Sequence, residues 1–289
     1  MLVERHALRC FTGQLRRYAT ATATAPRFQP VEELADSSLE SFRQRAFSPA
    51  LPVVLARGHF SQFPALKRWF LPQGNAYCLN DDYLNAHGTT MVPLELTRPG
   101  SSEDTFARLD APLSLFLDWT RQAGPETVDR LYLAQAQVTS LPKQLRDDLP
   151  VPSLVASAGK GDIYDTNLWI GLAPTYTSLH RDPNPNLFVQ LAGKKTVRLY
   201  TPEDGARIFQ RIQAKLGRGG SAAFRGEEMM HGEEKVFLEK EVWGDGAGEE
   251  VGQEAQLERG DSLFIPKGWW HSIKGVGNGV IGSVNWWFR

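Results

Sequence analysis

The second half of the chain is divided into short apolar runs by glycine and proline, and this pattern restricts the possible folds more than any other feature. Short runs that are rich in β-branched and aromatic side chains suit strands better than helices. They lie at 131–135, 168–172, 187–191, 196–200, 261–266, 269–273 and 280–288. A chain built from many short strands folds as a β-sandwich or a barrel. We therefore predict a mainly β fold with flanking helices.

The runs 187–191 and 196–200 are separated by a Gly-Lys turn, a spacing that predicts a β-hairpin. After them, residues 203–256 are polar, acidic and rich in glycine, with one helical pattern around 208–216. We interpret 203–256 as an insertion between two barrel strands. Such an insertion could cover a substrate groove or form the contact of a homodimer.

The part of the chain before the barrel mixes helices with one strand. The spacing of its apolar residues predicts helices at 31–47, 64–70 and 111–123. The run 52–55 is β-branched and bounded by proline and glycine, which predicts a strand. We assign 26–125 to a region that packs on the barrel, and 126–289 to the barrel itself.

The first 25 residues differ in composition from the rest. Four arginines stand against a single acid, Glu4, and an alternating run of alanine and threonine follows them. This composition is typical of a transit peptide, and residues 16–19 resemble a mitochondrial processing site with cleavage after Tyr18. We therefore predict a mitochondrial protein. If 1–25 is instead a disordered tail, the cytoplasm or the nucleus is the expected location.

Bulk composition excludes several classes of protein. The 32 basic and 33 acidic residues nearly cancel, so the chain lacks the basic footprint of a dedicated nucleic-acid binder. Two cysteines are too few for a disulfide framework or a cysteine-based zinc site, which favours a reducing compartment. The sequence holds no run of about 18 or more apolar residues, so no membrane span is predicted.

One histidine and one aspartate are placed as metal ligands would be. His180 and Asp182 are two positions apart, so in a strand both side chains leave the same face while Arg181 leaves the other. His271 lies in a tryptophan-rich strand and supplies a third ligand if the two strands meet. Two histidines and a carboxylate occupy one face of an octahedral ion and leave three positions open, which suits non-haem iron(II). A His-x-Asp pair alone is often only a surface pair, and His231 competes with His271 as third ligand.

Four stretches around these residues carry a resemblance to a known family. They are 177–186, 190–195, 260–271 and 283–287, in that order along the chain. The most specific is the Ile-Pro-x-x-Trp-Trp-His element that ends at His271. From about Phe47 to the C-terminus the chain resembles the JmjC family of cupin-like oxygenases, nearest to the small JmjC-only hydroxylases. The resemblance implies a double-stranded β-helix barrel of the jelly-roll or cupin type. It also implies iron(II) bound by His180, Asp182 and His271, with 2-oxoglutarate and O2 as cosubstrates.

A dicarboxylate chelated to iron needs a cation at its far end. Lys194 and Lys195 are the candidates, and strand alternation separates them. Lys195 shares a face with Val197 and Leu199, and this apolar face points into the barrel, where a lysine is costly unless an anion pairs with it. The Gly-x-Lys spacing of the family also selects Lys195. Two solvated turn lysines are the alternative.

The resemblance assigns four further residues to the cosubstrate pocket. Thr177 and Tyr132 would hydrogen-bond the distal carboxylate. Asn186 and Asn285 would line the iron-side carboxylate and the oxygen pocket. Hydroxyl and amide groups that face a barrel lumen need partners, although structural hydrogen bonds would satisfy any one of them equally well. The tryptophans at 269, 270, 286 and 287 are expected to pack in the core and at the rim.

These features predict an iron(II)- and 2-oxoglutarate-dependent dioxygenase that acts on a protein or peptide side chain. Hydroxylation is favoured over lysine demethylation, because the sequence shows no zinc-binding or reader module that would dock it on chromatin. A hydroxylase of tRNA or of small molecules, and a non-enzymatic cupin-like binding module, remain as alternatives. The sequence does not identify the substrate, because specificity lies in rim loops that no motif describes.

Overall fold

The computed structural model describes residues 27–99, 105–124, 126–217, 232–244, 248 and 250–289. The predicted transit segment 1–25 and the competing ligand His231 lie outside the described residues. None of the helices within the described ranges is long and apolar enough to cross a membrane.

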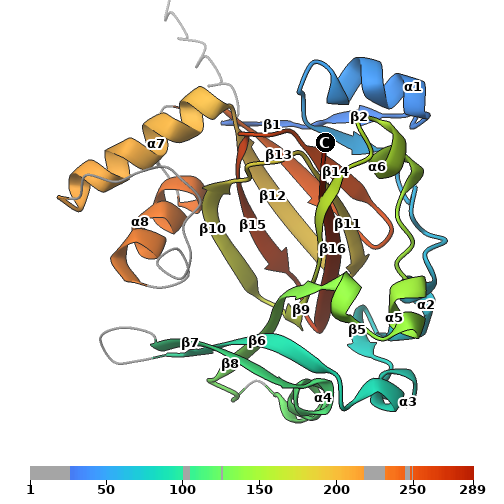
Figure 1. The fold of residues 1–289 in the computed structure, drawn as a ribbon. Coiled ribbons are helices and arrows are strands. Elements are labelled where there is room, and N and C mark those ends of the chain that lie inside the picture. Colours follow the sequence, from blue (N-terminus) through green and yellow to red (C-terminus); the bar gives the residue numbers. More distant parts are fainter. Residues whose placement is uncertain (1–26, 100–104, 125, 218–231, 245–247, 249) are drawn as a thin grey trace, which may run out of the picture.

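Two β-sheets form the body of the molecule (Figure 1). The five-stranded sheet has the order β1 (Phe28–Pro30), β13 (Gly252–Leu257), β12 (Lys194–Tyr200), β15 (Trp270–Val276) and β10 (Thr175–Arg181). The nine-stranded sheet has the order β2 (Glu32–Leu34), β3 (Val53–Leu55), β14 (Ser262–Ile265), β11 (Asn186–Ala192), β16 (Val280–Phe288), β9 (Ile163–Leu172), β8 (Arg130–Gln137), β6 (Met91–Arg98) and β7 (Thr105–Pro112). A separate pair consists of β4 (Phe70–Gln73) and β5 (Ala76–Leu79).

The chain crosses repeatedly from one sheet to the other. Strands β9, β11, β14 and β16 belong to the nine-stranded sheet, and β10, β12, β13 and β15 belong to the five-stranded sheet. This alternation winds the two sheets face to face as a double-stranded β-helix, so the predicted mainly β, cupin-type fold is confirmed. Apolar side chains from both inner faces, among them Phe188, Val197 and Ile265, fill the space between the sheets.

The predicted hairpin of 187–191 and 196–200 is wrong, because the two strands lie in different sheets. Strand β11 pairs on its two sides with β14 and β16, so it has no free edge for β12. Gly193 carries the chain across with a φ of 67°, and a Cβ there would lie 2.8 Å from the carbonyl oxygen of Val280. Sequence alternation cannot distinguish such a crossing from a hairpin, because both join two strands through a short turn.

The first predicted helix, 31–47, begins later than its apolar spacing indicated. Residues 32–34 form β2, which pairs in parallel with β3. Helix α1 (Leu39–Phe42) starts after Ser38, whose hydroxyl accepts a hydrogen bond from the amide of Ser41, and it continues as one turn of π-helix over Arg43–Phe47. Pairing with a neighbouring strand has therefore overridden local helical spacing. The strand at 52–55 and the helices at 64–70 and 111–123 are confirmed as β3, α2 (Pro64–Trp69) and α4 (Leu113–Gln122).

The range 203–256 contains two helices and one barrel strand. Helices α7 (Pro202–Lys215) and α8 (Gly232–Trp243) cover the outer face of the five-stranded sheet, whereas β13 lies within that sheet between β12 and β1. Gly205 lets α7 approach closely, because a Cβ there would lie 2.1 Å from Cγ of Trp270. The sequence analysis did not detect β13, since its run Gly-Gln-Glu-Ala-Gln-Leu is polar at most positions.

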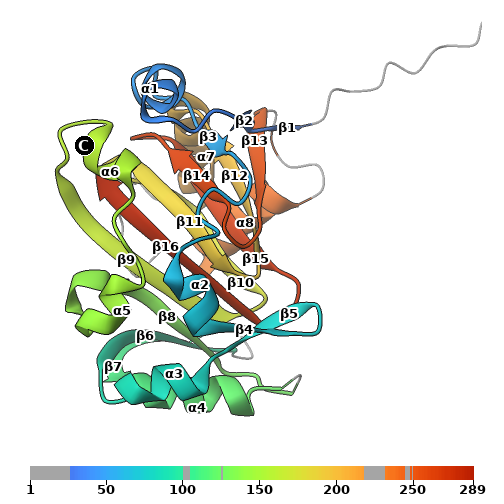
Figure 2. The ribbon, with the colours of Figure 1, turned by 90° about the vertical axis from the view of Figure 1, so that its right-hand side faces the viewer.

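Short helices from the part of the chain that precedes β9 pack on the opposite side of the molecule (Figure 2). Apart from α1 and α2, they include α3 (Asp81–Leu84), α5 (Lys143–Asp147) and α6 (Ser153–Ser157). Their apolar residues join the outward-facing residues of β11, Leu187, Val189 and Leu191, in the largest core cluster. Helices therefore cover the outer faces of both sheets with apolar contacts. Polar side chains between the sheets lie in an otherwise apolar interior.

Candidate metal centre

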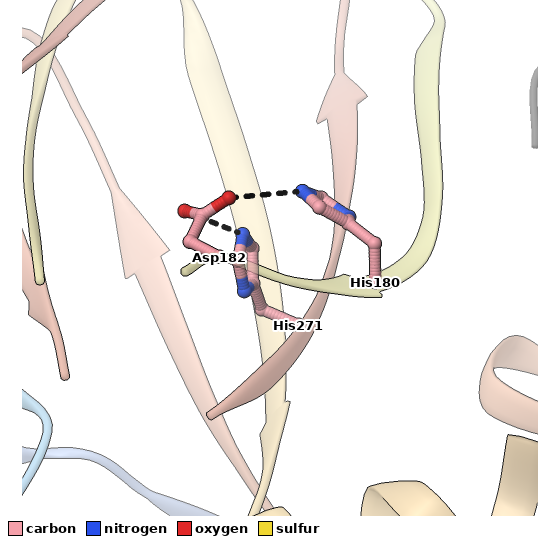
Figure 3. Close-up of side chains that lie close together, drawn as sticks. All are labelled: His180, Asp182 and His271. Atoms are coloured by element: carbon pink, nitrogen blue, oxygen red, sulfur yellow. Dashed lines mark ion pairs between the residues drawn. The ribbon is translucent and has the colours of Figure 1, made fainter. Parts of the chain in front are cut away.

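His180, Asp182 and His271 meet between the two sheets (Figure 3). His180 on β10 and His271 on β15 are directly opposite each other in register, and Asp182 follows the end of β10. One potential ligand atom from each residue lies within 4.8 Å of the other two. The structure thus brings together the three side chains that the sequence analysis selected.

A β-bulge turns His180 toward the lumen. Between the register pairs of Thr177 with Ile273 and of His180 with His271, β10 contains one more residue than β15. In a regular strand, residues three positions apart face opposite sides, so Thr177 and His180 could not both point inward. The bulge removes this conflict and leaves Leu179 in the cluster beneath α7 and α8.

Each histidine is held so that its Nε2 atom faces the centre. Nδ1 of His180 lies 2.8 Å from the carbonyl oxygen of Ser178, and Nδ1 of His271 lies 3.2 Å from that of Trp269. Because a carbonyl can only accept, Nδ1 carries the proton and the lone pair remains on Nε2. Burial and the neighbouring His180 ring lower the pKa of His271, so this imidazole is neutral. Neutral imidazoles with free Nε2 atoms are ready metal ligands.

The Asp182 carboxylate is oriented in the same manner. Its Oδ2 atom accepts hydrogen bonds from Nδ2 of Asn186 at 2.9 Å and from Nε1 of Trp287 at 3.0 Å. Its Oδ1 atom is buried without a hydrogen-bond partner among the described residues, 3.9 Å from Nε2 of His180. A buried carboxylate oxygen without a partner costs at least about 1–3 kcal/mol, which a bound cation would offset. The donor set and this orphaned oxygen together fit a divalent metal.

Trp287 is a functional residue that sequence reasoning missed, because all four C-terminal tryptophans were assigned to packing. Trp269, Trp270 and Trp286 are indeed buried in the core. Trp287 instead points into the lumen and donates to Asp182. The signal was present, since Trp287 is two positions from Asn285 and a strand places such residues on one face.

Lys195 faces inward, as strand alternation predicted. Its side chain is only 4% exposed, its Nζ donates to Oγ of Ser283 at 2.7 Å, and it lies 5.2 Å from the centre of the Phe188 ring. Burial lowers the pKa of Lys195 to about 7. Lys194, in contrast, is exposed and pairs with Glu258 at 2.6 Å. The lumen therefore holds one ammonium group that has no carboxylate partner within the described part of the chain.

The other four residues selected for the cosubstrate pocket also lie on the inner faces. Thr177 is in register with the core residue Ile273. The ring of Tyr132 covers Gly171, where a Cβ would lie 2.3 Å from Cδ2 of the tyrosine, and burial raises the pKa of its hydroxyl. Asn186 contacts Asp182 as described above. Oδ1 of Asn285 accepts a hydrogen bond from Nε1 of Trp169 at 2.7 Å.

A double-stranded β-helix with two histidines and one aspartate on its inner faces is the architecture of a cupin-type metal-binding barrel. The sequence model of the cupin-like domain matches residues 39–289, and the chain belongs to this family, in its JmjC branch.

Three curated relatives illustrate the range of similarity. "Lysine-specific demethylase JMJ30" of Arabidopsis thaliana is 29% identical over 259 residues, which cover 89% of this chain and 54% of that protein. "Lysine-specific demethylase 8" of Xenopus tropicalis is 26% identical over 267 residues, 89% of this chain and 52% of that protein. "Bifunctional peptidase and (3S)-lysyl hydroxylase JMJD7" of Homo sapiens is 27% identical over 304 residues, 98% of this chain and 91% of that protein. The chain spans about half the length of the first two relatives and most of the length of the third.

Proposed function

We propose that this protein is an iron(II)- and 2-oxoglutarate-dependent dioxygenase that hydroxylates a protein side chain. The observation that carries the proposal is the triad itself, in which two imidazoles and one carboxylate each offer a ligand atom within 4.8 Å of the other two. Membership of the JmjC branch of the cupin-like family supports it. Three protein ligands leave room on an octahedral ion for a chelating cosubstrate and oxygen.

When bound, iron(II) would supply the redox chemistry, in which 2-oxoglutarate and O2 yield succinate and CO2 while the second oxygen atom enters a substrate C–H bond. The chain's own residues hold and orient the reactants. His180, Asp182 and His271 would hold the metal. Asn186 and Trp287 keep the Asp182 carboxylate turned so that Oδ1 faces the metal position. The apolar residues around the lumen exclude water.

Lys195 would bind the distal carboxylate of 2-oxoglutarate. An ammonium group in this apolar surrounding is stabilised by an anion, and Lys195 has only the Ser283 hydroxyl as a hydrogen-bond partner in the described residues. Tyr132 and Thr177 face the same lumen and would donate hydroxyl hydrogen bonds to that carboxylate.

A lysine side chain is the substrate we propose, because each of the three relatives carries a name that refers to lysine. The inner face of β9 offers a suitable partner for its charge. Asp165 is in register with Trp287, and its Oδ1 atom accepts a hydrogen bond from the amide of Thr166 at 2.9 Å. A half-buried carboxylate on the strand next to Trp287, with no cationic partner among the described residues, would attract the ammonium group of a substrate.

The decisive experiment incubates the purified protein with iron(II), ascorbate, 2-oxoglutarate and a library of lysine-containing peptides. We expect succinate release and a peptide that gains one oxygen atom, and neither with Asp182→Ala. Loss of a methyl group from a methylated peptide, without net oxygen gain, would instead favour the demethylase activity named for two of the relatives. A metal-loaded wild-type protein that binds 2-oxoglutarate but releases no succinate with any peptide would favour a binding module and contradict the proposal.

A further inference from the structure

The outer edge of β7 ends the nine-stranded sheet. Strand β7 pairs with β6 on one side, and no other strand of the described chain pairs with it (Figure 1). Its pairing with β6 runs from Pro112 to Thr105 without a register shift. Exposed sheet edges are commonly protected by a bulge, an internal proline or a lysine, and β7 contains none of these. The backbone groups along this edge can therefore pair with a further strand.

The side chains of β7 also leave apolar surface at this edge. Leu109 is 38% exposed, although its register partner Leu94 is buried at 1%. Leu94 belongs to the core cluster that includes Phe116 and Leu117 of α4. The apolar layer between α4 and the sheet therefore continues to the outermost strand and ends there, with Leu109 partly in solvent. A neighbouring strand would remove this side chain from water, which is favourable.

Two opposite charges lie on the other face of β7. Nε and Nη2 of Arg108 donate to Oε1 of Glu95 at 3.0 and 2.8 Å, and Nη1 is left for another acceptor. Asp110 is exposed, and within the described ranges its carboxylate forms no hydrogen bond or ion pair. Arg108 and Asp110 can therefore each form a further charge-assisted hydrogen bond. Because they are two positions apart, their side chains leave the same face of the strand.

The order of these charges selects one register for two copies of β7. In an antiparallel pair, side chains directly opposite each other interact, and opposite charges stabilise the pair whereas like charges destabilise it. If a two-fold axis passes through Leu109, Arg108 of each copy is opposite Asp110 of the other. An axis through Arg108 would oppose two guanidinium groups, and an axis through Asp110 would oppose two carboxylates. Among these three registers, only the one centred on Leu109 has two attractive pairs.

We infer that β7 is a dimer contact through which two copies of this chain join their nine-stranded sheets edge to edge, with Leu109 on the two-fold axis. Leu109 then contacts its own copy, Ala107 is opposite Ala111, and the two pairs of Arg108 with Asp110 flank the axis. An unrelated extended peptide would match this order of charges only by chance, so a second copy is the favoured occupant. The contact is the same on both chains and therefore closes at the dimer. One strand pair is a small interface, so we expect a dissociation constant on the order of 10 µM.

Sedimentation velocity of the full-length protein between about 1 and 100 µM tests the contact. We expect wild type to pass from monomer to dimer, and Asp110→Lys to dimerise at least about tenfold more weakly, because two attractive pairs become repulsive. Asp147→Lys is the matched control, since it makes the same change of charge at the exposed C-terminal end of α5, away from β7 (Figure 1). Its dimerisation should equal that of wild type. A wild type that stays monomeric at about 100 µM, or an Asp110→Lys variant that dimerises as tightly, would overturn the inference.

A pair of cysteine variants tests the register itself, in a background where Cys10 and Cys78 are replaced by serine. Leu109→Cys places two thiols opposite each other, with Cβ atoms about 5 Å apart and close to disulfide geometry. Ala107→Cys places them roughly 13 Å apart along the strands. Both positions are exposed, so both variants should keep the thermal transition of their background. With copper–phenanthroline as oxidant, we expect a cross-linked dimer from Leu109→Cys and none from Ala107→Cys. Cross-linking that does not favour Leu109→Cys would overturn the register and, with it, the dimer contact.

Discussion

Replacing Lys195 with methionine should stabilise the ligand-free protein while destroying its affinity for 2-oxoglutarate. Methionine has a similar length and an apolar side chain, so it fills the space beside Phe188 without a charge. The lysine is 4% exposed and has one hydrogen bond, to Ser283, at 2.7 Å. We expect its charge to be unfavourable for folding and favourable only for binding an anion.

The size of the effect follows from the lowered pKa of Lys195, which is about 7 in the folded protein against 10.5 for an unperturbed lysine. Between these values the unfolded chain binds one proton more than the folded chain, so stability rises with pH. The slope of the free energy of unfolding is about 1.4 kcal/mol per pH unit in this range. The destabilisation by the buried lysine therefore disappears above the unfolded pKa and reaches its full size as pH falls below about 7. The lost hydrogen bond to Ser283 offsets about 1 kcal/mol. At neutral pH, Lys195→Met should therefore be more stable than wild type by a few kcal/mol.

Urea unfolding of both proteins at roughly pH 7, 8 and 9, with chelator and without 2-oxoglutarate, tests this reasoning. The readout is the difference between the two proteins, because other groups titrate equally in both. That difference should shrink by about 1.4 kcal/mol for each pH unit upward. In parallel, Lys195→Met should bind N-oxalylglycine, an unreactive analogue of 2-oxoglutarate, at least about a hundredfold more weakly. Parallel pH dependences in the two proteins would refute the buried, partnerless lysine, and unchanged binding would refute its role toward the cosubstrate.

Three further changes have defined outcomes. Trp287→Phe removes one of the two hydrogen bonds to Asp182, so metal affinity measured by competition with a chelator should fall about 10–100-fold; an unchanged affinity would mean that Asn186 alone orients the carboxylate. Asp148→Asn should lower the free energy of unfolding by about 3 kcal/mol, because this fully buried carboxylate accepts from Trp69, Tyr83 and Arg68; a loss below about 1 kcal/mol would contradict that account. Residues 1–30 fused to a fluorescent protein should direct it to mitochondria, and a diffuse signal would argue against a transit peptide.

Several residues of the candidate metal centre and of the lumen could be predicted from the alternation of side chains along a strand. The two-residue spacing of His180 and Asp182 places both on one face of a strand, and the same alternation selects Lys195 over Lys194. These inferences succeed because side-chain direction in a strand depends only on parity along the chain. The Ile-Pro-x-x-Trp-Trp-His element added His271 through resemblance, since no local rule connects a residue so distant in sequence.

Tertiary structure decided everything that depends on which strands are neighbours. The path of β11 and β12 into different sheets, the strand β13 within a polar stretch, and the early strand β2 all follow from pairing partners far away in sequence. The bulge that turns His180 inward is likewise invisible in a pattern that assumes regular alternation. Hydrogen bonds such as that from Trp287 to Asp182 exist only once β16 lies beside β11. Residue order thus determines the direction of each side chain within its own strand, whereas the packing of strands determines which side chains meet.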